Sequence, residues 1–168
     1  PDIGRFFNID PLAEKFYYNS PYAFSENKVT THVELEGLEA FGIHGTWSSS
    51  ATWENQEALS EVMNTAYGNN ESNFGFNWSG DNLSSARSEA ALELISHVRA
   101  NRSEDPNEPI TLIGHSHGGN VAIEAVNMMS GMEEFNGVNI NLVTINTPVR
   151  DDYQLSDAAA ARVEHVNV

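Results

Sequence analysis

From Phe41 onward, hydrophobic residues recur at strand and helix spacing, and polar or glycine-containing turns separate the segments. Short apolar runs predict strands, at 41–44, 73–78, 110–113, 140–145 and 164–168. Apolar stripes with helical spacing predict helices, at 58–66, 84–98 and 121–129, the second capped by Ser84 or Ser85. A short helix is also expected at 157–162. Strands alternating with helices predict an α/β fold, a mostly parallel sheet with helices on both faces.

The segment 110–122 carries the strongest chemical signal. A short apolar strand runs into Gly114-His115-Ser116-His117-Gly118, and a helix rich in small residues follows at once. This G-x-S-x-G pattern between a strand and a helix is typical of a nucleophilic serine, whose hydroxyl the tight turn raises above the sheet edge. Ser116 is therefore the candidate nucleophile. The alternative is an ordinary strand-to-helix turn whose serine has no chemical role.

Attack of a serine on an acyl carbon creates an oxyanion, which needs backbone N–H donors held in place. His117 follows the nucleophile at the start of the helix, where the helix dipole favours negative charge. The second donor is expected in the loop after the first strand, as the amide of Gly45 or Thr46. Both loops follow the carboxyl ends of strands, which is where parallel sheets bind ligands.

The pair His44-Gly45, combined with the turn around Ser116, resembles the α/β-hydrolase family and within it the lipases and esterases. The resemblance covers residues 40–168. It implies a carboxylate and a histidine base in the chain order serine, acid, histidine. That order places both partners beyond Val168, which implies a domain incomplete at its C-terminus. Within the chain, the alternatives are Asp151, Asp152 or Asp157 as the acid and His165 as the base.

Charge and composition limit the partners and cofactors. The 168 residues carry a formal net charge of −16, which disfavours binding to nucleic acid and to anionic bilayers. The chain has no cysteine, which excludes disulfides and thiolate metal sites, and no stretch has the pattern of a membrane span or a signal peptide. Zinc bound by His44, His115 and His117 is an alternative, but the last two flank a sharp turn and should point apart. We therefore expect no metal and no other cofactor.

Residues 1–37 differ from the rest, because they are aromatic and rich in turns but show no clear periodicity. The motifs Gly4-Arg5-Phe6, Asp10-Pro11-Leu12-Ala13 and Ser20-Pro21-Tyr22 resemble the end of an RHS repeat-associated core domain. The resemblance implies that 1–37 belong to an RHS core shell and that 38–168 form the effector that the shell carries. It also implies a bacterial protein that is secreted or delivered as part of a larger chain, with an immunity protein as a partner.

The sequence thus predicts a serine hydrolase that cleaves carboxylic esters through an acyl-enzyme on Ser116. A lipid substrate follows from the resemblance, because an effector with this fold can harm a competitor by attacking its membrane. An amidase or a thioesterase would use the same nucleophile. The alternative from another class is a non-enzymatic α/β module that binds or plugs the RHS shell.

Overall fold

The computed structural model describes residues 39–55, 72–73, 75–102 and 108–167. The chain divides into two units, Pro1–Glu36 and Gly37–Val168, and every described residue belongs to the second. The segment 1–37, which resembles an RHS core, and the helix predicted at 58–66 lie outside the described residues.

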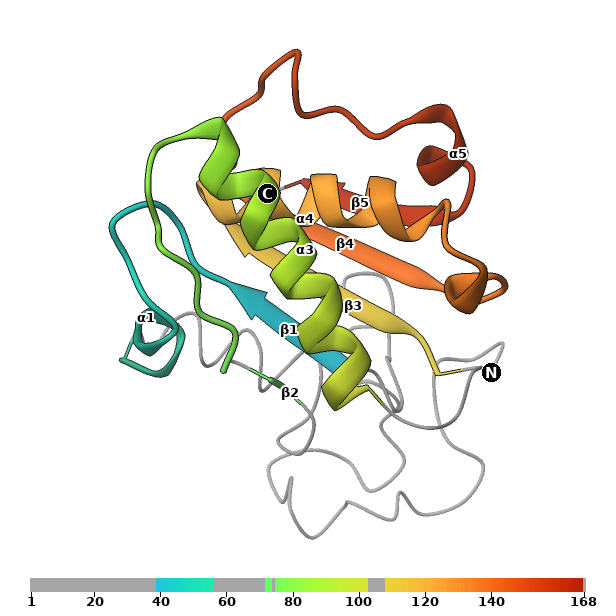
Figure 1. The fold of residues 1–168 in the computed structure, drawn as a ribbon, viewed down its shortest axis with the longest axis horizontal. Coiled ribbons are helices and arrows are strands. Elements are labelled where there is room, and N and C mark those ends of the chain that lie inside the picture. Colours follow the sequence, from blue (N-terminus) through green and yellow to red (C-terminus); the bar gives the residue numbers. More distant parts are fainter. Residues whose placement is uncertain (1–38, 56–71, 74, 103–107, 168) are drawn as a thin grey trace, which may run out of the picture. The chain divides into compact units, whose positions relative to one another are not determined.

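A parallel sheet runs through the described part of the chain, with its strands in the order β2-β1-β3-β4-β5 (Figure 1). Every neighbouring pair of strands is parallel. Parallel neighbours need long crossover connections, in which helices lie. The predicted parallel α/β fold is therefore confirmed. The strands are β1 (Glu39–Ile43), β2 (Ser72–Asn73), β3 (Ile110–His115), β4 (Ile140–Ile145) and β5 (Val163–Asn167).

The strand predicted at 73–78 is wrong beyond Asn73, because β2 contains only Ser72 and Asn73. The backbone N–H of Trp78 donates to Nε2 of His44 at 3.2 Å, and its indole N–H donates to the His44 carbonyl at 2.9 Å. Hydrogen bonds to His44 therefore replace the strand ladder at this point. The other four predicted strands are present, and β4 has the predicted bounds.

The predicted helical stripes around Ala90 and Val121 are confirmed as the buried faces of two helices. The predicted serine cap is wrong: Leu83 is the N-cap, with extended backbone angles and no side-chain cap, and Ser84 is already helical. No helix in the described ranges is long and apolar enough to cross a bilayer. The helices are α1 (Ala51–Asn55), α3 (Ser84–Asn101), α4 (His117–Met129), the 3-10 helix η2 (Glu133–Phe135) and α5 (Asp157–Ala160).

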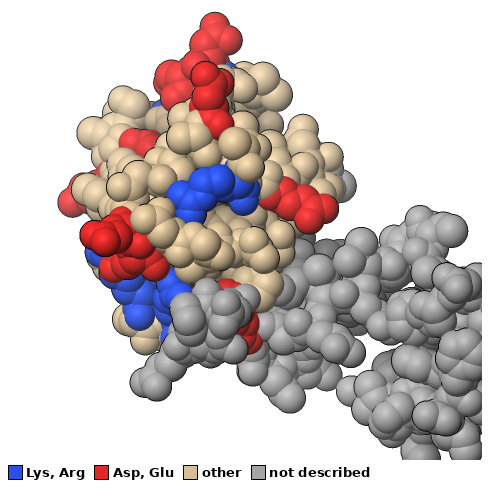
Figure 2. Space-filling model, turned by 90° about the vertical axis from the view of Figure 1, so that its right-hand side faces the viewer, with Lys and Arg blue, Asp and Glu red and all other residues tan. Residues whose placement is uncertain are grey.

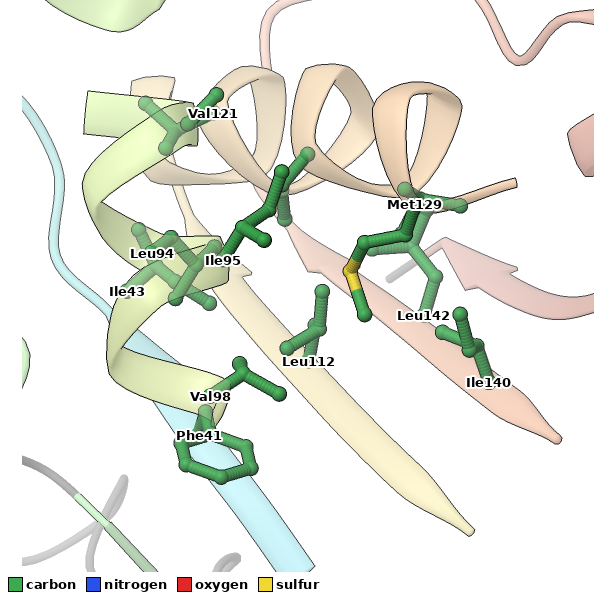
Figure 3. Close-up of a cluster of buried hydrophobic side chains, with 14 of the residues drawn as sticks. Phe41, Ile43, Leu94, Ile95, Val98, Leu112, Val121, Met129, Ile140 and Leu142 are labelled. Atoms are coloured by element: carbon green, nitrogen blue, oxygen red, sulfur yellow. The ribbon is translucent and has the colours of Figure 1, made fainter. Parts of the chain in front are cut away.

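The main hydrophobic core lies between the sheet and the helices α3 and α4. Figure 3 shows Leu94, Ile95 and Val98 of α3 on one side of Leu112 of β3 and Leu142 of β4 on its other side, all within one buried cluster. All five side chains are at most 1% exposed, and burying each contributes about 1.5–3 kcal/mol. Val121 of α4 belongs to the same cluster, so this core also packs α4 against the sheet.

A smaller core lies on the opposite face of the sheet, under α1. Trp53 of α1 is 1% exposed and packs with Ala40 of β1 and Ile113 of β3. Strand β3 therefore buries Leu112 on one face and Ile113 on the other, as expected of a central parallel strand. The prediction of helices on both faces is confirmed.

The strand order reverses between β1 and β3. Strand β2 lies outside β1, whereas β4 and β5 continue on the other side of β3. Such a reversal leaves a crevice outside the carboxyl ends of the two strands, and ligands of open α/β sheets bind there. The loop after β1 begins at His44, and β3 leads directly into Ser116. The topology thus brings together the two segments that the sequence singles out.

The charged groups are mixed on the part of the surface that Figure 2 presents. Acidic side chains lie at several separate places on this face, and basic side chains lie between them. An exposed ion pair of this kind joins Arg99 of α3 to Glu134 of η2. The acidic balance of the whole chain therefore does not make this face uniformly negative.

Candidate active site

Ser116 occupies the sharp corner between β3 and α4. Its backbone angles are φ 54° and ψ −131°, a conformation that residues other than glycine rarely adopt. Its N–H donates to the Ile145 carbonyl at 2.9 Å, and its carbonyl accepts the Gly119 N–H at 3.0 Å. The Ser116 hydroxyl makes no helix cap. These two backbone hydrogen bonds hold the corner, and the Ser116 side chain belongs neither to β3 nor to α4.

Two glycines are required around this corner because backbone segments approach each other closely. A Cβ on Gly114 would collide with the backbone of Gly118 and Gly119, and a Cβ on Gly118 would collide with the carbonyl groups of Ile43 and His44. The G-x-S-x-G spacing thus reflects contact of α4 with the ends of both β3 and β1. This is the strand–turn–helix arrangement that projects a nucleophilic serine.

The loop after β1 lies directly against Ser116. A Cβ on Gly45 would come within 2.9 Å of Ser116 Cβ and 3.4 Å of Ser116 Oγ. The N–H of Trp47 fixes the loop by donating to the Gly80 carbonyl at 2.9 Å. The structure therefore places the predicted donor segment, Gly45 and Thr46, beside the predicted nucleophile.

His44 orients the peptide between Gly45 and Thr46. Its Nδ1 lies 2.9 Å from the Gly45 carbonyl, and its Nε2 accepts the Trp78 N–H. A carbonyl can only accept and a backbone N–H can only donate, so the His44 ring is neutral with its proton on Nδ1. In a trans peptide the N–H points opposite to the C=O, so the Thr46 N–H points away from His44. Burial lowers the pKa of His44, which favours this neutral form.

Several buried polar atoms near the corner have no hydrogen-bond partner in the described part of the chain. They are Oγ1 of Thr46, Oδ1 of Asn120 and Oγ1 of Thr147. Thr147 lies against Gly119, because a Cβ on that glycine would collide with the threonine side chain. Unsatisfied buried groups are rare in folded proteins and mark places where water or a ligand completes the site.

His117 follows Ser116 and begins α4. Its Nδ1 lies 3.1 Å from Nδ2 of Asn120, and because the amide nitrogen donates, the ring nitrogen accepts. Burial lowers the pKa of His117, and the positive charges of Arg87 and Arg150 lower it further. His117 is therefore neutral at physiological pH, with its backbone N–H at the positive end of α4.

The candidate acids and base are not hydrogen-bonded to Ser116 or His117 in the described structure. Asp151 and Asp152 are exposed on the loop after β4, and Asp152 accepts hydrogen bonds from Arg150 at 2.9 and 3.1 Å. His165 lies within β5 opposite Leu142, and its Nε2 is 3.0 Å from Thr144 Oγ1. The role of each in catalysis stays a prediction.

The three histidines considered for zinc do not form a ligand set in the described residues, where no group of three potential ligands occurs. Both ring nitrogens of His44 are engaged by the protein itself. His115 ends β3 and His117 begins α4, on opposite sides of the corner.

Two polar residues near the site did not emerge from the sequence. Arg87 is buried on α3, and its Nε donates to the hydroxyl of Tyr153 at 2.8 Å. The sequence could have indicated that Arg87 is buried. It precedes Ala90 and Ala91 by three and four residues and therefore lies on the same buried face of the helix. Tyr153 lies in an irregular loop, where periodicity carries no information.

Three solved structures are similar to the chain. A cutinase-like protein from Cryptococcus sp. matches with a TM-score of 0.53 and 14% sequence identity, over 80% of this chain and 78% of that chain. Two structures of acetyl xylan esterase match with TM-scores of 0.49 and 0.48 and identities of 16% and 17%, each over 78% of this chain and 82% of that chain. No protein-family model matches the sequence, and a search of curated proteins found no match. The chain shares its fold with the cutinase-like protein.

Proposed function

We propose that the protein is a serine hydrolase of α/β-hydrolase type that cleaves carboxylic esters through an acyl-enzyme on Ser116. The observation that supports this most directly is the strained corner at Ser116, with φ 54°, lying against the Gly45 loop at the carboxyl ends of β1 and β3, where the strand order reverses. A fold does not need a strained serine at this point for stability. Strain of this kind persists at functional sites.

In the proposed reaction, Ser116 Oγ attacks the ester carbonyl and loses its proton to a base. The N–H groups of His117 and Thr46 stabilise the oxyanion. The buried Thr46 hydroxyl, which has no partner among the described residues, serves as a further donor. The alcohol then leaves with the proton, and water releases the acid from Ser116. The base and its carboxylate are proposed to follow β5, as the resemblance implies.

The proposed substrate is a lipid ester. Three large apolar side chains are exposed on loops at the carboxyl edge of the sheet, namely Trp47 (85%), Leu83 (60%) and Val149 (86%). Exposed apolar groups around a polar crevice favour contact with an apolar substrate surface. The acidic balance of the chain does not assist adsorption to anionic bilayers, so this contact supplies the attraction instead.

The proposed setting is an effector carried by an RHS protein, delivered out of a bacterial cell and held in check by an immunity protein. This proposal depends on the motifs in 1–37, which lie outside the described residues. Co-expression of the chain with its neighbouring gene product, followed by measurement of growth and membrane integrity, would test it.

A fluorophosphonate probe tests the nucleophile in the full chain. We expect one adduct by intact-mass measurement, mapped to Ser116, and none in Ser116→Ala. Ser96→Ala is the matched control, because Ser96 lies on α3 with its hydroxyl bonded to the Leu92 carbonyl, and it should label like the natural chain. Equal labelling of Ser116→Ala would refute the proposal. Because the base is proposed to follow β5, the probe is applied to the full-length protein. A full-length protein that folds but does not label at all would favour the non-enzymatic module.

A further inference from the structure

Arg87 is a buried cation without a charged partner in the described structure. Only 3% of the residue is exposed. Its Nε donates to Tyr153 Oη at 2.8 Å and its Nη1 to Asn82 Oδ1 at 3.3 Å, and both acceptors are neutral. Its Nη2 makes no hydrogen bond to a described residue. Buried guanidinium groups are almost always paired with an anion, because desolvating an unpaired charge is costly.

Arg150 brings a second cation to the same aromatic ring. The Cζ atoms of Arg87 and Arg150 lie 5.2 and 5.8 Å from the centroid of the Tyr153 ring. Asp152 is the carboxylate of this cluster, and it binds Arg150 through two hydrogen bonds. The pKa of Asp152 is lowered chiefly by Arg150, and the charge of Arg87 contributes least. One carboxylate thus faces two cations, and the cluster keeps a net positive charge.

The cluster adjoins the nucleophile. Arg150 and Tyr153 lie on the loop that follows β4, and the last residue of β4, Ile145, accepts the N–H of Ser116. The charges of Arg87 and Arg150 both reach His117, whose pKa they help to lower. A cavity of about 250 Å³ also borders Tyr153, but Glu124 and Asp152 line it, so its charge does not suit an anion.

We propose that Arg87, with Arg150 at its rim, forms a subsite for a phosphate or carboxylate group of the ester substrate, beside Ser116. The proposal rests on the proposed hydrolase function and narrows it to anionic esters. A guanidinium binds both groups through its planar fork, with charge-assisted hydrogen bonds. Bound there, the anion supplies the charged partner that Arg87 lacks. Because the chain has a net charge of −16, an anionic substrate is repelled overall, and a local cluster of cations supplies the attraction that binds it.

Binding is tested separately from catalysis in the full chain carrying Ser116→Ala. We expect inorganic phosphate to raise the unfolding temperature more than chloride does at equal ionic strength. Adding Arg150→Gln or Arg87→Lys should weaken the apparent phosphate affinity about tenfold or more, because each removes charge-assisted hydrogen bonds. Arg99→Gln is the matched control, because Arg99 pairs with Glu134 on the surface and should not change the affinity. Equal phosphate affinity in all variants would overturn the proposal.

Substrate preference is tested with Ser116 intact, by comparing p-nitrophenyl hemiglutarate with its neutral methyl ester. We expect the ratio of kcat/KM for the two to fall about tenfold in Arg150→Gln and Arg87→Lys and to stay constant in Arg99→Gln. Unchanged ratios would overturn the proposal even though Ser116 reacts. If neither ester reacts but phosphate affinity still depends on Arg87 and Arg150, the hydrolase fails and the anion site stands. If the protein does hydrolyse esters, its rates on phosphatidylglycerol and on diacylglycerol in mixed vesicles are compared. This comparison distinguishes a phosphate headgroup from a carboxylate as the source of the anion.

Discussion

The backbone strain at Ser116 leads to a prediction about stability that does not depend on catalysis. At φ 54° a residue with a Cβ is strained, whereas glycine adopts this conformation freely. Ser116→Gly should therefore stabilise the fold relative to Ser116→Ala, although both variants lack the nucleophile. The two backbone bonds of Ser116, to Ile145 and from Gly119, are available to either variant. The comparison thus isolates the strain.

The size of the effect follows from two opposing terms. A strained backbone of this kind costs about 1–3 kcal/mol. Glycine loses more entropy on folding than alanine does, which costs about 0.5–1 kcal/mol. We therefore expect Ser116→Gly to exceed Ser116→Ala in free energy of unfolding by about 0.5–2 kcal/mol. This difference corresponds to an unfolding temperature roughly 2–6 °C higher.

Urea unfolding followed by circular dichroism measures the difference, and Ser130 provides the matched control. Ser130 caps the other end of α4 with ordinary helical angles, φ −63° and ψ −20°. There, glycine should be less stable than alanine by about 0.5–1 kcal/mol. If Ser116→Gly is no more stable than Ser116→Ala while the Ser130 pair behaves as expected, the backbone at Ser116 is not strained. Ser116 would then lie on an ordinary turn, and its conformation would no longer support a role as nucleophile.

Two further predictions concern the loop after β1. Gly45→Ala should slow fluorophosphonate labelling of Ser116 by about tenfold to a hundredfold, because its Cβ would lie 2.9 Å from Ser116 Cβ and displace the reacting groups. Gly131→Ala is the control and should label at the normal rate, because its Cβ would meet nothing nearer than 3.6 Å. If Gly45→Ala labels as fast as Gly131→Ala, the loop after β1 does not touch the site. Burial lowers the pKa of His44 in the folded state. When the pH falls below the ordinary histidine pKa of about 6.5, His44 is therefore protonated more readily in the unfolded chain than in the folded one. Stability should therefore fall as the pH decreases below about 6.5, and His44→Gln should reduce this dependence in urea unfolding at several pH values; an unchanged dependence would contradict the assigned role of His44.

Much of the fold could be predicted because its elements follow local patterns. The apolar stripes of α3 and α4 are also their buried faces, so periodicity alone located both helices. The mainly apolar run Ile140–Ile145 likewise coincides with β4. The corner at Ser116 could be predicted for the same reason, since contacts within five residues and with the adjacent strand dictate its glycines.

The features that could not be predicted depend on contacts between distant residues. The apolar run at 73–78 predicts a strand that includes Trp78, but the backbone N–H of Trp78 donates to His44, 34 residues earlier. Arg87 contacts Tyr153, 66 residues later, and a charged residue on a helix is expected to face solvent unless its partner is known. The N-cap of α3 is a local exception: Leu83 begins the helix through its extended backbone conformation and not through a side-chain hydrogen bond, so no capping residue marks it in the sequence.

The strained residues of the described structure are gathered at one edge of the sheet. The residues other than glycine with positive φ there are Trp47, Ser116 and Asn146, which follow β1, β3 and β4. Each such conformation costs free energy that the two cores beneath the edge must offset. Because the order of the strands reverses between β1 and β3, two of these loops flank the crevice. A sheet that needed only to fold would relax these corners with glycine, so their retention at the edge where the loop of Gly45 and Thr46 meets Ser116 supports the proposal that this edge binds and reacts with a ligand.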